Sequence, residues 1–428
     1  MAAAAGAQEP SRTQARVRSF LAAVLVAVLT IGLLEAGLRT FPQLLPVSLI
    51  ADFPVVQRGR LAQRLDLPST ATRVPVGRSD GGPALTAWAP HAVFRIEADP
   101  EDVVLGATTT YQMDDQGFCN ADDAATFPPG SIVVLGDSFT WCTGVRATET
   151  WASHMQRTLG RPVRNLGLAG VGPYEYLQLY EQFGAALRPA IVVLNVYQGN
   201  DLRDAAAYHN EVRPGTIPSL SQRTAIRFNA VSGARIARSA LVRLRESPIG
   251  VLYSVDIVIA AMLQAVNATV RTDFGYTVAV AGEPVAMNIH DFDADEVDHA
   301  RVVGDDPSVL ETAFAGALES FQALSLRDGF TPVVAYTPSA YTAYADSVRF
   351  SDAAVGRAVS EFSAAQRRWF AERCATLGIA FADLTMPLRA AARTAPSPLY
   401  FPANIHLTAA GHAVVAGALV QSLAEGTR

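Results

Sequence analysis

The sequence contains no lysine, so arginine supplies all 34 of its basic residues. This absence excludes the phosphate-binding lysine of P-loop proteins and every mechanism that forms a Schiff base. The formal net charge is −6, and the arginines form no dense basic cluster. A nucleic-acid partner held by phosphate contacts is therefore not expected.

Cysteine is scarce. The three cysteines, Cys119, Cys142 and Cys374, show no C-x-x-C spacing, so the chain has no zinc or iron–sulfur motif. In an oxidising compartment one disulfide is expected, and Cys119 and Cys142 are the better pair because they flank the first strand of the main domain. Three buried thiols that pack as small hydrophobic groups are the alternative. The acidic stretch HDFDADEVDH at 290–299 lacks the glycine of a calcium-binding loop, and we interpret it as a solvated loop.

One long hydrophobic run lies near the N-terminus. Residues 20–34, FLAAVLVAVLTIGLL, are uncharged and follow Arg12, Arg16 and Arg18. The run reaches the ~20 residues that a bilayer span requires if it continues to Leu38. No small-residue cleavage motif follows it, so we predict an uncleaved signal-anchor helix with the arginines in the cytoplasm. The remainder of the chain would then be extracytoplasmic, in the periplasm or at the cell surface.

The sequence divides into three regions. Residues 1–40 are interpreted as a cytoplasmic tail and signal-anchor, 41–127 as a membrane-proximal connecting region rich in Pro, Gly, Thr and Asp, and 128–428 as the main domain. A stretch from about 205 to 305 interrupts the pattern of the main domain. We interpret it as a helical insertion, and a second membrane span within its apolar part is the alternative.

Short apolar runs alternate with helical stretches in the main domain, which predicts an α/β fold with a parallel sheet covered on both faces. The runs expected to form strands are 131–135, 163–168, 190–197, 331–336 and 379–384. The stretches expected to form helices are 149–160, 173–187, 308–326, 353–377 and 408–423.

Small and polar residues gather where the predicted strands end. GDS, ending at Ser138, follows the first strand; NLGLAGVGP, containing Gly170, follows the second; and GND, containing Asn200, follows the third. The segment FPANIHLTAAGH places His406 just before the last helix. Because the carboxyl ends of parallel strands share one edge of a sheet, these distant loops are expected to meet there.

The four blocks, in this order, resemble those of the SGNH (GDSL-type) hydrolases, in particular their membrane-anchored bacterial members. The resemblance covers roughly the last 300 residues, the insertion excepted. It implies a three-layer, flavodoxin-like parallel sheet with the active site at the carboxyl ends of the strands. It also implies ester chemistry that needs no metal ion and no organic cofactor.

The resemblance gives each block a role. Ser138 would attack an ester carbonyl, and His406 would take its proton, since a serine hydroxyl is a poor nucleophile without a base. The oxyanion hole would consist of the backbone N–H groups of Ser138 and Gly170 and the side-chain amide of Asn200.

Other residues of these blocks are given structural roles. Asp137 and Asp201 are interpreted as carboxylates that brace their loops, and His412 as part of the last helix. The structural alternative for the site itself is that Ser138 caps the following helix and Asn200 holds its own turn.

The sequence departs from the family pattern at one position. SGNH hydrolases carry an aspartate two or three residues before the histidine, where this chain has Asn404 and Ala403. An asparagine can accept a hydrogen bond from the ring and fix its tautomer, but it supplies no negative charge. Three outcomes follow: a Ser–His dyad braced by Asn404 or by a backbone carbonyl, a carboxylate supplied from elsewhere, or loss of activity. Asp383 is the nearest acid in the sequence.

We therefore predict an extracytoplasmic serine ester hydrolase that acts through an acyl-enzyme. Its substrate would be a small-molecule or glycan acyl ester of the cell envelope, and its N-terminal helix would contact the membrane. An O-acyltransferase with the same residues and a non-catalytic envelope-binding protein of the same fold are the alternatives.

Overall fold

The computed structural model describes residues 29–41, 73–76, 85–96, 98–212, 275–288 and 295–426, together with residues 22, 26, 241, 244, 258, 259 and 262. The chain divides into two units. One comprises residues 1–70 and 230–271, and the other comprises residues 71–229 and 272–428.

The longest described stretch of the first unit is a helix over residues 29–40. Within it, Arg39 pairs with Glu35 one turn earlier, at 2.5 Å between Nε and Oε1. Among the described residues, no helix combines the length and the apolar character that a membrane crossing requires. Much of the predicted signal-anchor at 20–34 lies outside these residues.

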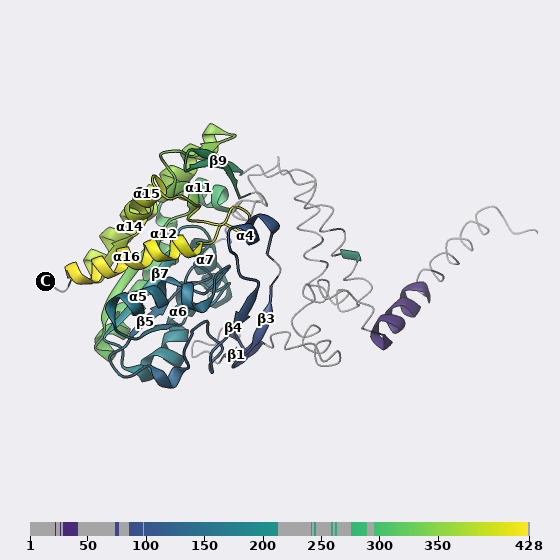
Figure 1. The fold of residues 1–428 in the computed structure, drawn as a ribbon, viewed down its shortest axis with the longest axis horizontal. Helices are drawn as coiled ribbons and strands as arrows, with labels where there is room; N and C mark the ends of the chain where they lie inside the picture. Colours follow the sequence, from purple (N-terminus) through teal and green to yellow (C-terminus); the bar gives the residue numbers. More distant parts are fainter. Residues whose placement is uncertain are drawn as a thin grey trace, which may run out of the picture. The chain divides into compact units, whose positions relative to one another are not determined.

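The second unit contains a parallel sheet, which has five strands among the described residues (Figure 1). They are β5 (Ile132–Leu135), β6 (Val163–Asn165), β7 (Ile191–Tyr197), β10 (Thr331–Thr337) and β12 (Ala380–Asp383). All of them lie within or beside the predicted apolar runs, because strands covered on both faces expose few positions to water. The order across the sheet is β6-β5-β7-β10-β12, the 2-1-3-4-5 order of flavodoxin-like folds. The predicted α/β fold with a parallel sheet is confirmed.

Helices cover both faces of this sheet. α5 (Trp151–Leu159) packs against α16 (Ala409–Gly426), whereas α12 (Ser308–Asp328) packs against α6 (Pro173–Leu179), α7 (Asp201–Val212) and α14 (Ala353–Leu377). Right-handed crossovers place α5 on one face and the helices after β6, β7 and β10 on the other. The connection after β5 therefore leads toward one edge of the sheet and the connection after β7 toward the other. Ligands of such folds bind at the carboxyl ends of the two neighbouring strands whose connections part in this way.

Shorter elements surround the sheet. Further helices are α4 (Pro100–Val104), α11 (Asp295–Asp305), α13 (Ala340–Ala343) and α15 (Thr385–Ala392), with 3-10 turns at η2 (Ala124–Thr126), η3 (Ala147–Glu149) and η5 (Ala185–Leu187). Antiparallel pairs join β1 (Arg73–Val76) to β2 (Leu85–Trp88), β3 (Val93–Arg95) to β4 (Thr110–Gln112), and β8 (Tyr276–Val280) to both β9 (Glu283–Met287) and β11 (Arg349–Phe350).

Two stretches differ from their expected structure. The helix expected at 173–187 is α-helical only through Leu179 and continues as a π-helical turn, η4 (Tyr180–Gly184), and η5. The acidic stretch expected as a solvated loop enters α11 at Asp295, and its Glu296 is buried. Its acidic composition indicated solvent exposure because the partners that bury Glu296 lie far away in the sequence.

The predicted connecting region at 41–127 and the predicted insertion at about 205–305 are only partly described. From residue 71 onward, the predicted connecting region belongs to the same unit as the sheet, and its described residues contribute β1, β2, β3, β4 and α4. The apolar run at 247–270, for which a second membrane span is the alternative, lies outside the described residues apart from 258, 259 and 262.

Candidate active site

Ser138 lies in the turns that follow β5. Residues 137–145 form turns with a bend at each end rather than a helix, and α5 begins only at Trp151. Thr150 Oγ1 accepts a hydrogen bond from the Ser153 N–H, so Thr150 is the residue that caps this helix. The capping interpretation of Ser138 is therefore wrong, and its half-buried side chain lies at the carboxyl end of a central strand.

His406 lies in the loop that leads into α16. The loop folds back on itself: the Phe401 N–H donates to the His406 carbonyl at 2.7 Å, and the Ile405 N–H donates to the Phe401 carbonyl at 2.8 Å. Ile405 has a φ of +58°, a left-handed conformation that a β-branched residue rarely adopts. Such a residue costs about 1–3 kcal/mol and persists only where surrounding contacts fix the chain.

The two predicted side chains are in contact. His406 Nε2 lies 2.8 Å from Ser138 Oγ, and Nδ1 of the same ring lies 2.8 Å from the main-chain oxygen of Asn404. A carbonyl oxygen only accepts hydrogen bonds, so Nδ1 carries the proton of the neutral ring. Nε2 is then left to accept the hydrogen of the Ser138 hydroxyl, which is the arrangement of a nucleophile and its general base.

Asn404 contacts the ring through its main chain and not through its side chain. Its Oδ1 instead accepts a hydrogen bond from the backbone N–H of His406 at 3.0 Å, a local turn typical of asparagine. The expected bond between amide and ring is replaced because the side-chain oxygen is already engaged by this neighbouring N–H. The partner of Nδ1 is therefore a neutral carbonyl group and not the carboxylate of the family pattern.

Burial keeps the histidine uncharged. The His406 ring stacks on Phe139, with 4.6 Å between ring centroids, and Phe139 stacks on Tyr197 at 3.6 Å. Burial lowers the pKa of His406 to about 4, and the hydrogen bond to the Asn404 carbonyl opposes this shift. At neutral pH the ring is unprotonated at Nε2 and able to take a proton.

Several solved structures that are similar to this chain carry GDSL or esterase names. One belongs to a protein from Desulfitobacterium hafniense assigned to the G-D-S-L family of lipolytic proteins: 14% identity, TM-score 0.35, 68% of this chain and 98% of that chain covered. A GDSL-like lipase from Bacteroides thetaiotaomicron is 14% identical with a TM-score of 0.32, and the match covers 69% of this chain and 88% of that chain. An acetyl xylan esterase is 12% identical with a TM-score of 0.31, and the match covers 68% of this chain and 99% of that chain. No protein-family model and no curated protein matches the sequence. The strand order and site geometry of this chain, rather than these similarities, support the function proposed below.

The loop after β6 packs closely on the nucleophile turn. A Cβ at Gly167 would lie 2.7 Å from the carbonyl carbon of Thr140, so the two backbones approach more closely than any side chain allows. Asn165 Nδ2 donates to the Thr140 oxygen at 2.8 Å across the same contact. These contacts fix the backbone two residues after Ser138.

The predicted oxyanion donors lie on the loops after β6 and β7. Gly170 is exposed and has a φ of +78°, and a Cβ there would meet nothing within 4 Å, so conformation rather than crowding requires glycine. Asn200 Nδ2 donates to Asp204 Oδ2 at 2.6 Å, which uses one of the two amide hydrogens and orients the group. The roles of Ser138 N–H, Gly170 N–H and the Asn200 amide as oxyanion donors stay predictions.

Asp137 and Asp201 are fully buried and brace the loops after β5 and β7, as predicted. Asp137 Oδ1 accepts the Phe139 N–H at 2.9 Å. Asp201 accepts the Tyr176 hydroxyl at 2.6 Å and the Tyr197 N–H at 2.9 Å. Burial raises the pKa of Asp137 to about 7 and that of Asp201 well above its usual range, and the charge of Asp137 adds to the shift of Asp201.

A carboxylate that sequence reasoning missed contacts the histidine loop. Asp102 in α4 is fully buried, and its Oδ1 and Oδ2 accept the N–H groups of Ala403 and Asn404 at 3.0 and 3.1 Å. Burial raises the pKa of Asp102, and these two hydrogen bonds oppose the shift. No local pattern could have indicated a partner about 300 positions away. Asp383, the acid nearest in sequence, bonds Arg367 at 2.7 Å instead.

Another buried acid lies against the loop that carries Asn200. Glu296 in α11 accepts hydrogen bonds from Ser339 Oγ at 2.8 Å and from the Tyr341 hydroxyl. A Cβ at Gly199 would lie 2.6 Å from Glu296 Oε1, so Glu296 packs directly on this loop. The sequence did not predict this buried role, because Glu296 lies in an acidic stretch that was interpreted as a solvated loop.

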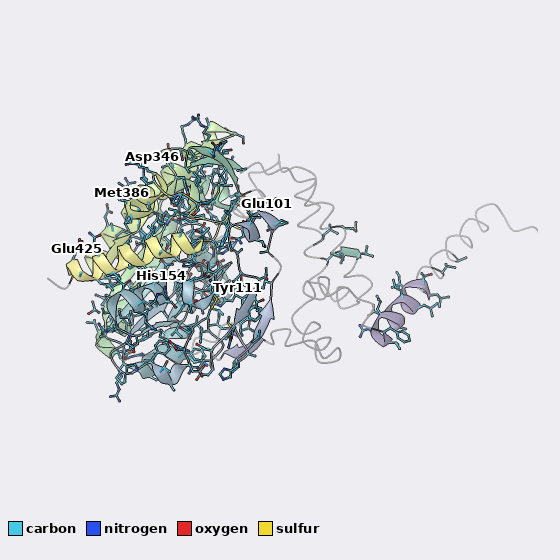
Figure 2. The ribbon with its side chains drawn as sticks, in the orientation of Figure 1. Glu101, Tyr111, His154, Asp346, Met386 and Glu425 are labelled. Carbon is cyan, nitrogen blue, oxygen red and sulfur yellow. A yellow bond between two sulfur atoms is a disulfide. The ribbon has the colours of Figure 1, made fainter. Side chains whose placement is uncertain are left out.

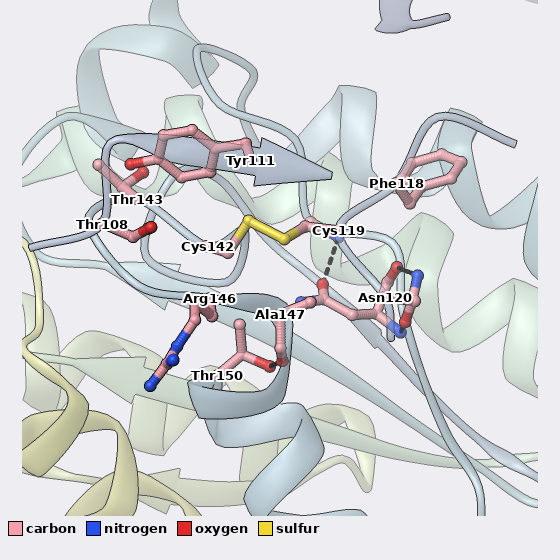
Figure 3. The surroundings of a disulfide bond; sticks show 12 residues. Thr108, Tyr111, Phe118, Cys119, Asn120, Cys142, Thr143, Arg146, Ala147 and Thr150 are labelled. Atoms are coloured by element: carbon pink, nitrogen blue, oxygen red, sulfur yellow. Dashed lines mark hydrogen bonds between the residues drawn. A yellow bond between two sulfur atoms is a disulfide. The ribbon is translucent and has the colours of Figure 1, made fainter. Parts of the chain in front are cut away.

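A disulfide joins the nucleophile turn to the chain that follows β4. Cys119 is bonded to Cys142, and Figure 3 shows Tyr111 and Thr143 beside the bond. The Tyr111 hydroxyl accepts the Gly144 N–H at 2.8 Å, which adds a second link between the same segments. Cys374 is a buried free thiol.

His412 and Trp141 have structural surroundings. His412 is buried, and its Nδ1 accepts the backbone N–H of Trp151 at 3.1 Å, in agreement with the structural role expected for it. Trp141 is buried in a stack with Tyr111 and Phe94, at 5.1 and 6.4 Å between ring centroids. Neither residue is part of the candidate site.

Proposed function

We propose that this chain is a serine ester hydrolase of the SGNH type, with Ser138 as nucleophile and His406 as general base. The observation that supports it most directly is the 2.8 Å contact between Ser138 Oγ and His406 Nε2. The carbonyl that accepts Nδ1–H and the lowered pKa of the ring both leave Nε2 free of a proton. These are the conditions under which an imidazole activates a serine hydroxyl.

The reaction follows from these contacts. Ser138 Oγ attacks the carbonyl carbon of the ester while its proton passes to His406 Nε2. The Gly170 N–H and the Asn200 amide would stabilise the oxyanion that forms. His406 returns the proton to the departing alkoxide, and the acyl group stays bonded to Ser138 Oγ. A water molecule then attacks the acyl carbon while its proton passes to His406 Nε2. The bond to Ser138 Oγ breaks, Oγ takes the proton back from His406, and the acid leaves, while Nδ1 keeps its bond to the Asn404 carbonyl throughout.

Esterase assays with two variants test the proposal. The purified protein is expected to hydrolyse p-nitrophenyl acetate, and Ser138→Ala and His406→Ala to lower kcat by at least about 10³-fold, because each removes one member of a single catalytic unit. Equal rates for all three proteins would favour a non-catalytic binding protein. Adding a glycan acceptor and identifying the acyl product separates hydrolysis from O-acyl transfer.

The proposed location is extracytoplasmic, with the N-terminal segment as membrane anchor and small-molecule or glycan acyl esters of the envelope as substrates. The Cys119–Cys142 disulfide supports an oxidising compartment. Protease added to intact spheroplasts is expected to digest the main domain, and the anchor fragment is expected to resist carbonate extraction. A protected domain would contradict the location, and a released fragment would contradict the anchor.

A further inference from the structure

Asp102 holds the tip of the histidine loop from an element outside it. Its two carboxylate oxygens accept the consecutive N–H groups of Ala403 and Asn404, and its side chain is fully buried. Hydrogen bonds to an ionised acceptor are among the stronger ones in proteins. Without the carboxylate, the buried Ala403 N–H would lose its partner, which is unfavourable for a donor that water does not reach.

Asn404 transmits this contact to the catalytic ring. Its N–H donates to Asp102, its carbonyl oxygen accepts from His406 Nδ1, and its Oδ1 accepts from the His406 N–H. One residue therefore connects the carboxylate to the imidazole. The next residue, Ile405, is in a left-handed conformation that relaxes once the loop is no longer fixed. A shift of Asn404 would turn the ring away from Ser138.

The segment that carries Asp102 is itself attached to the nucleophile turn. Thr108, which follows α4, donates its N–H to the Gly144 carbonyl at 2.9 Å, and Tyr111 in β4 accepts the Gly144 N–H. Figure 1 shows α4 beside the chain that leads into α16. The segment from α4 to β4 thus contacts both the serine turn and the histidine loop, and it fixes one relative to the other.

We propose that Asp102 is a positioning residue for His406 and takes over, from a separate element, the orienting role of the acid that the histidine loop lacks. This inference rests on the proposed esterase function. In the family pattern the acid bonds the ring itself, whereas here the carboxylate bonds the residue whose carbonyl bonds the ring. Asp102 therefore supplies orientation, and the ring keeps its neutral partner.

Asp102→Asn tests this role with little change of volume. The amide has only one acceptor oxygen, so one of the two loop N–H groups would face an NH₂ donor. A misplacement near 1 Å costs about 10²-fold in rate, so kcat for p-nitrophenyl acetate is expected to fall about 10²-fold while KM stays within about twofold. The matched control is Glu101→Gln, which removes a charge from the exposed neighbouring position of α4 (Figure 2) and should leave kcat unchanged.

A double-mutant cycle separates positioning from a general structural defect. Because Asp102 acts through His406, Asp102→Asn is expected to change the fluorophosphonate labelling rate of Ser138 by less than about twofold in a His406→Ala background. If Asp102→Asn does not fold, as judged by circular dichroism, Asp102→Glu replaces it. This variant keeps both acceptors but displaces the loop, and the same loss of kcat at constant KM is expected.

Two results would overturn the role of Asp102. One is a kcat within about twofold of wild type in a folded Asp102 variant. The other is an equal loss of labelling in the presence and absence of His406. A wild-type protein no faster than Ser138→Ala would instead refute the proposed function itself.

Discussion

At the scale of single residues, the candidate site consists of two side chains and one carbonyl oxygen. Ser138 and His406 were predictable because each lies at a strand end or before a helix in a pattern that the sequence displays. The partner of Nδ1 could not be chosen from the sequence, because the side chain and the main chain of Asn404 both offer an acceptor oxygen. The structure shows that the side-chain oxygen is engaged by the His406 N–H and that the main-chain oxygen accepts from the ring. Asp102 was not predictable, because its partners lie across the fold.

Placing an aspartate at position 404 is expected to change the esterase rate little. In Asn404→Asp the ring keeps its bond to the main-chain carbonyl, and the new carboxylate would lie near buried Asp102, where like charges repel. We expect kcat for p-nitrophenyl acetate to rise by no more than about twofold. A tenfold gain would mean that the ring turns toward the side chain at position 404, against the geometry described above.

The pH profile of the esterase should reflect a buried, neutral histidine. The pKa of His406 is lowered to about 4, so Nε2 is still unprotonated at about pH 5. We expect kcat/KM, which reports the free enzyme, to stay level from about pH 8 to about pH 5 and to fall only near pH 4. Initial rates taken within minutes of dilution, with circular dichroism at each pH as the control, provide the measurement. An acid limb near pH 6.5 would show that the ring titrates as if exposed.

At the scale of elements, the apolar runs of the sequence predicted most of the helices and strands of the sheet domain. The predicted helix at 353–377 coincides with α14, and the predicted strands lie at β5, β6, β7, β10 and β12. The prediction of a solvated loop at 290–299 was wrong for Glu296. Acidic residues indicate solvent exposure only where no hydrogen-bond donor from elsewhere in the chain buries them, and Ser339 and Tyr341 are such donors for Glu296. The sequence therefore led to a wrong prediction where the burial of an element depends on side chains far away in the chain.

The disulfide should contribute to stability mainly through the unfolded chain. Cys119 and Cys142 are separated by 23 positions, and closing a loop of this length stabilises a protein by ~3 kcal/mol in the chain-entropy model. We expect the Cys119→Ser/Cys142→Ser variant to lose about this much free energy of unfolding in urea titrations. As the control, a reductant should lower the stability of wild type and leave the variant unchanged. A variant as stable as the oxidised wild type would show that the bond adds nothing.

At the scale of the whole molecule, strand order brings the serine and histidine together across 268 positions of sequence. The division into two units was less accessible: residues 1–70 group with 230–271, and no local composition shift indicates that two separate stretches share one unit. Parallel strand order follows from general packing rules, whereas the pairing of distant segments depends on contacts that a single sequence does not display.

Buried acids beside the site should make global stability depend on pH. The pKa of Asp137 is about 7 in the folded protein against 3.8 ordinarily, so the folded state binds this proton more tightly than the unfolded state. Its contribution to stability is complete below about pH 4 and is lost as the pH rises toward 7. The shift corresponds to about 4 kcal/mol at most.

Asp137→Asn removes this titration while keeping an oxygen for the Phe139 N–H. Urea unfolding of wild type and variant at about pH 5 and about pH 8 gives the comparison. We expect the wild type to lose more stability than the variant between these two pH values. An identical pH dependence in both proteins would contradict the buried titration.

The most direct measurement is the site at which a fluorophosphonate reacts. This reagent forms a stable adduct only with an activated serine, so mass spectrometry of a digest reports both activation and identity. We expect one adduct, on the peptide containing Ser138, formed at least about 10²-fold more slowly in His406→Ala. No adduct on the folded protein, or one on a different serine, would contradict the catalytic role of the Ser138–His406 pair.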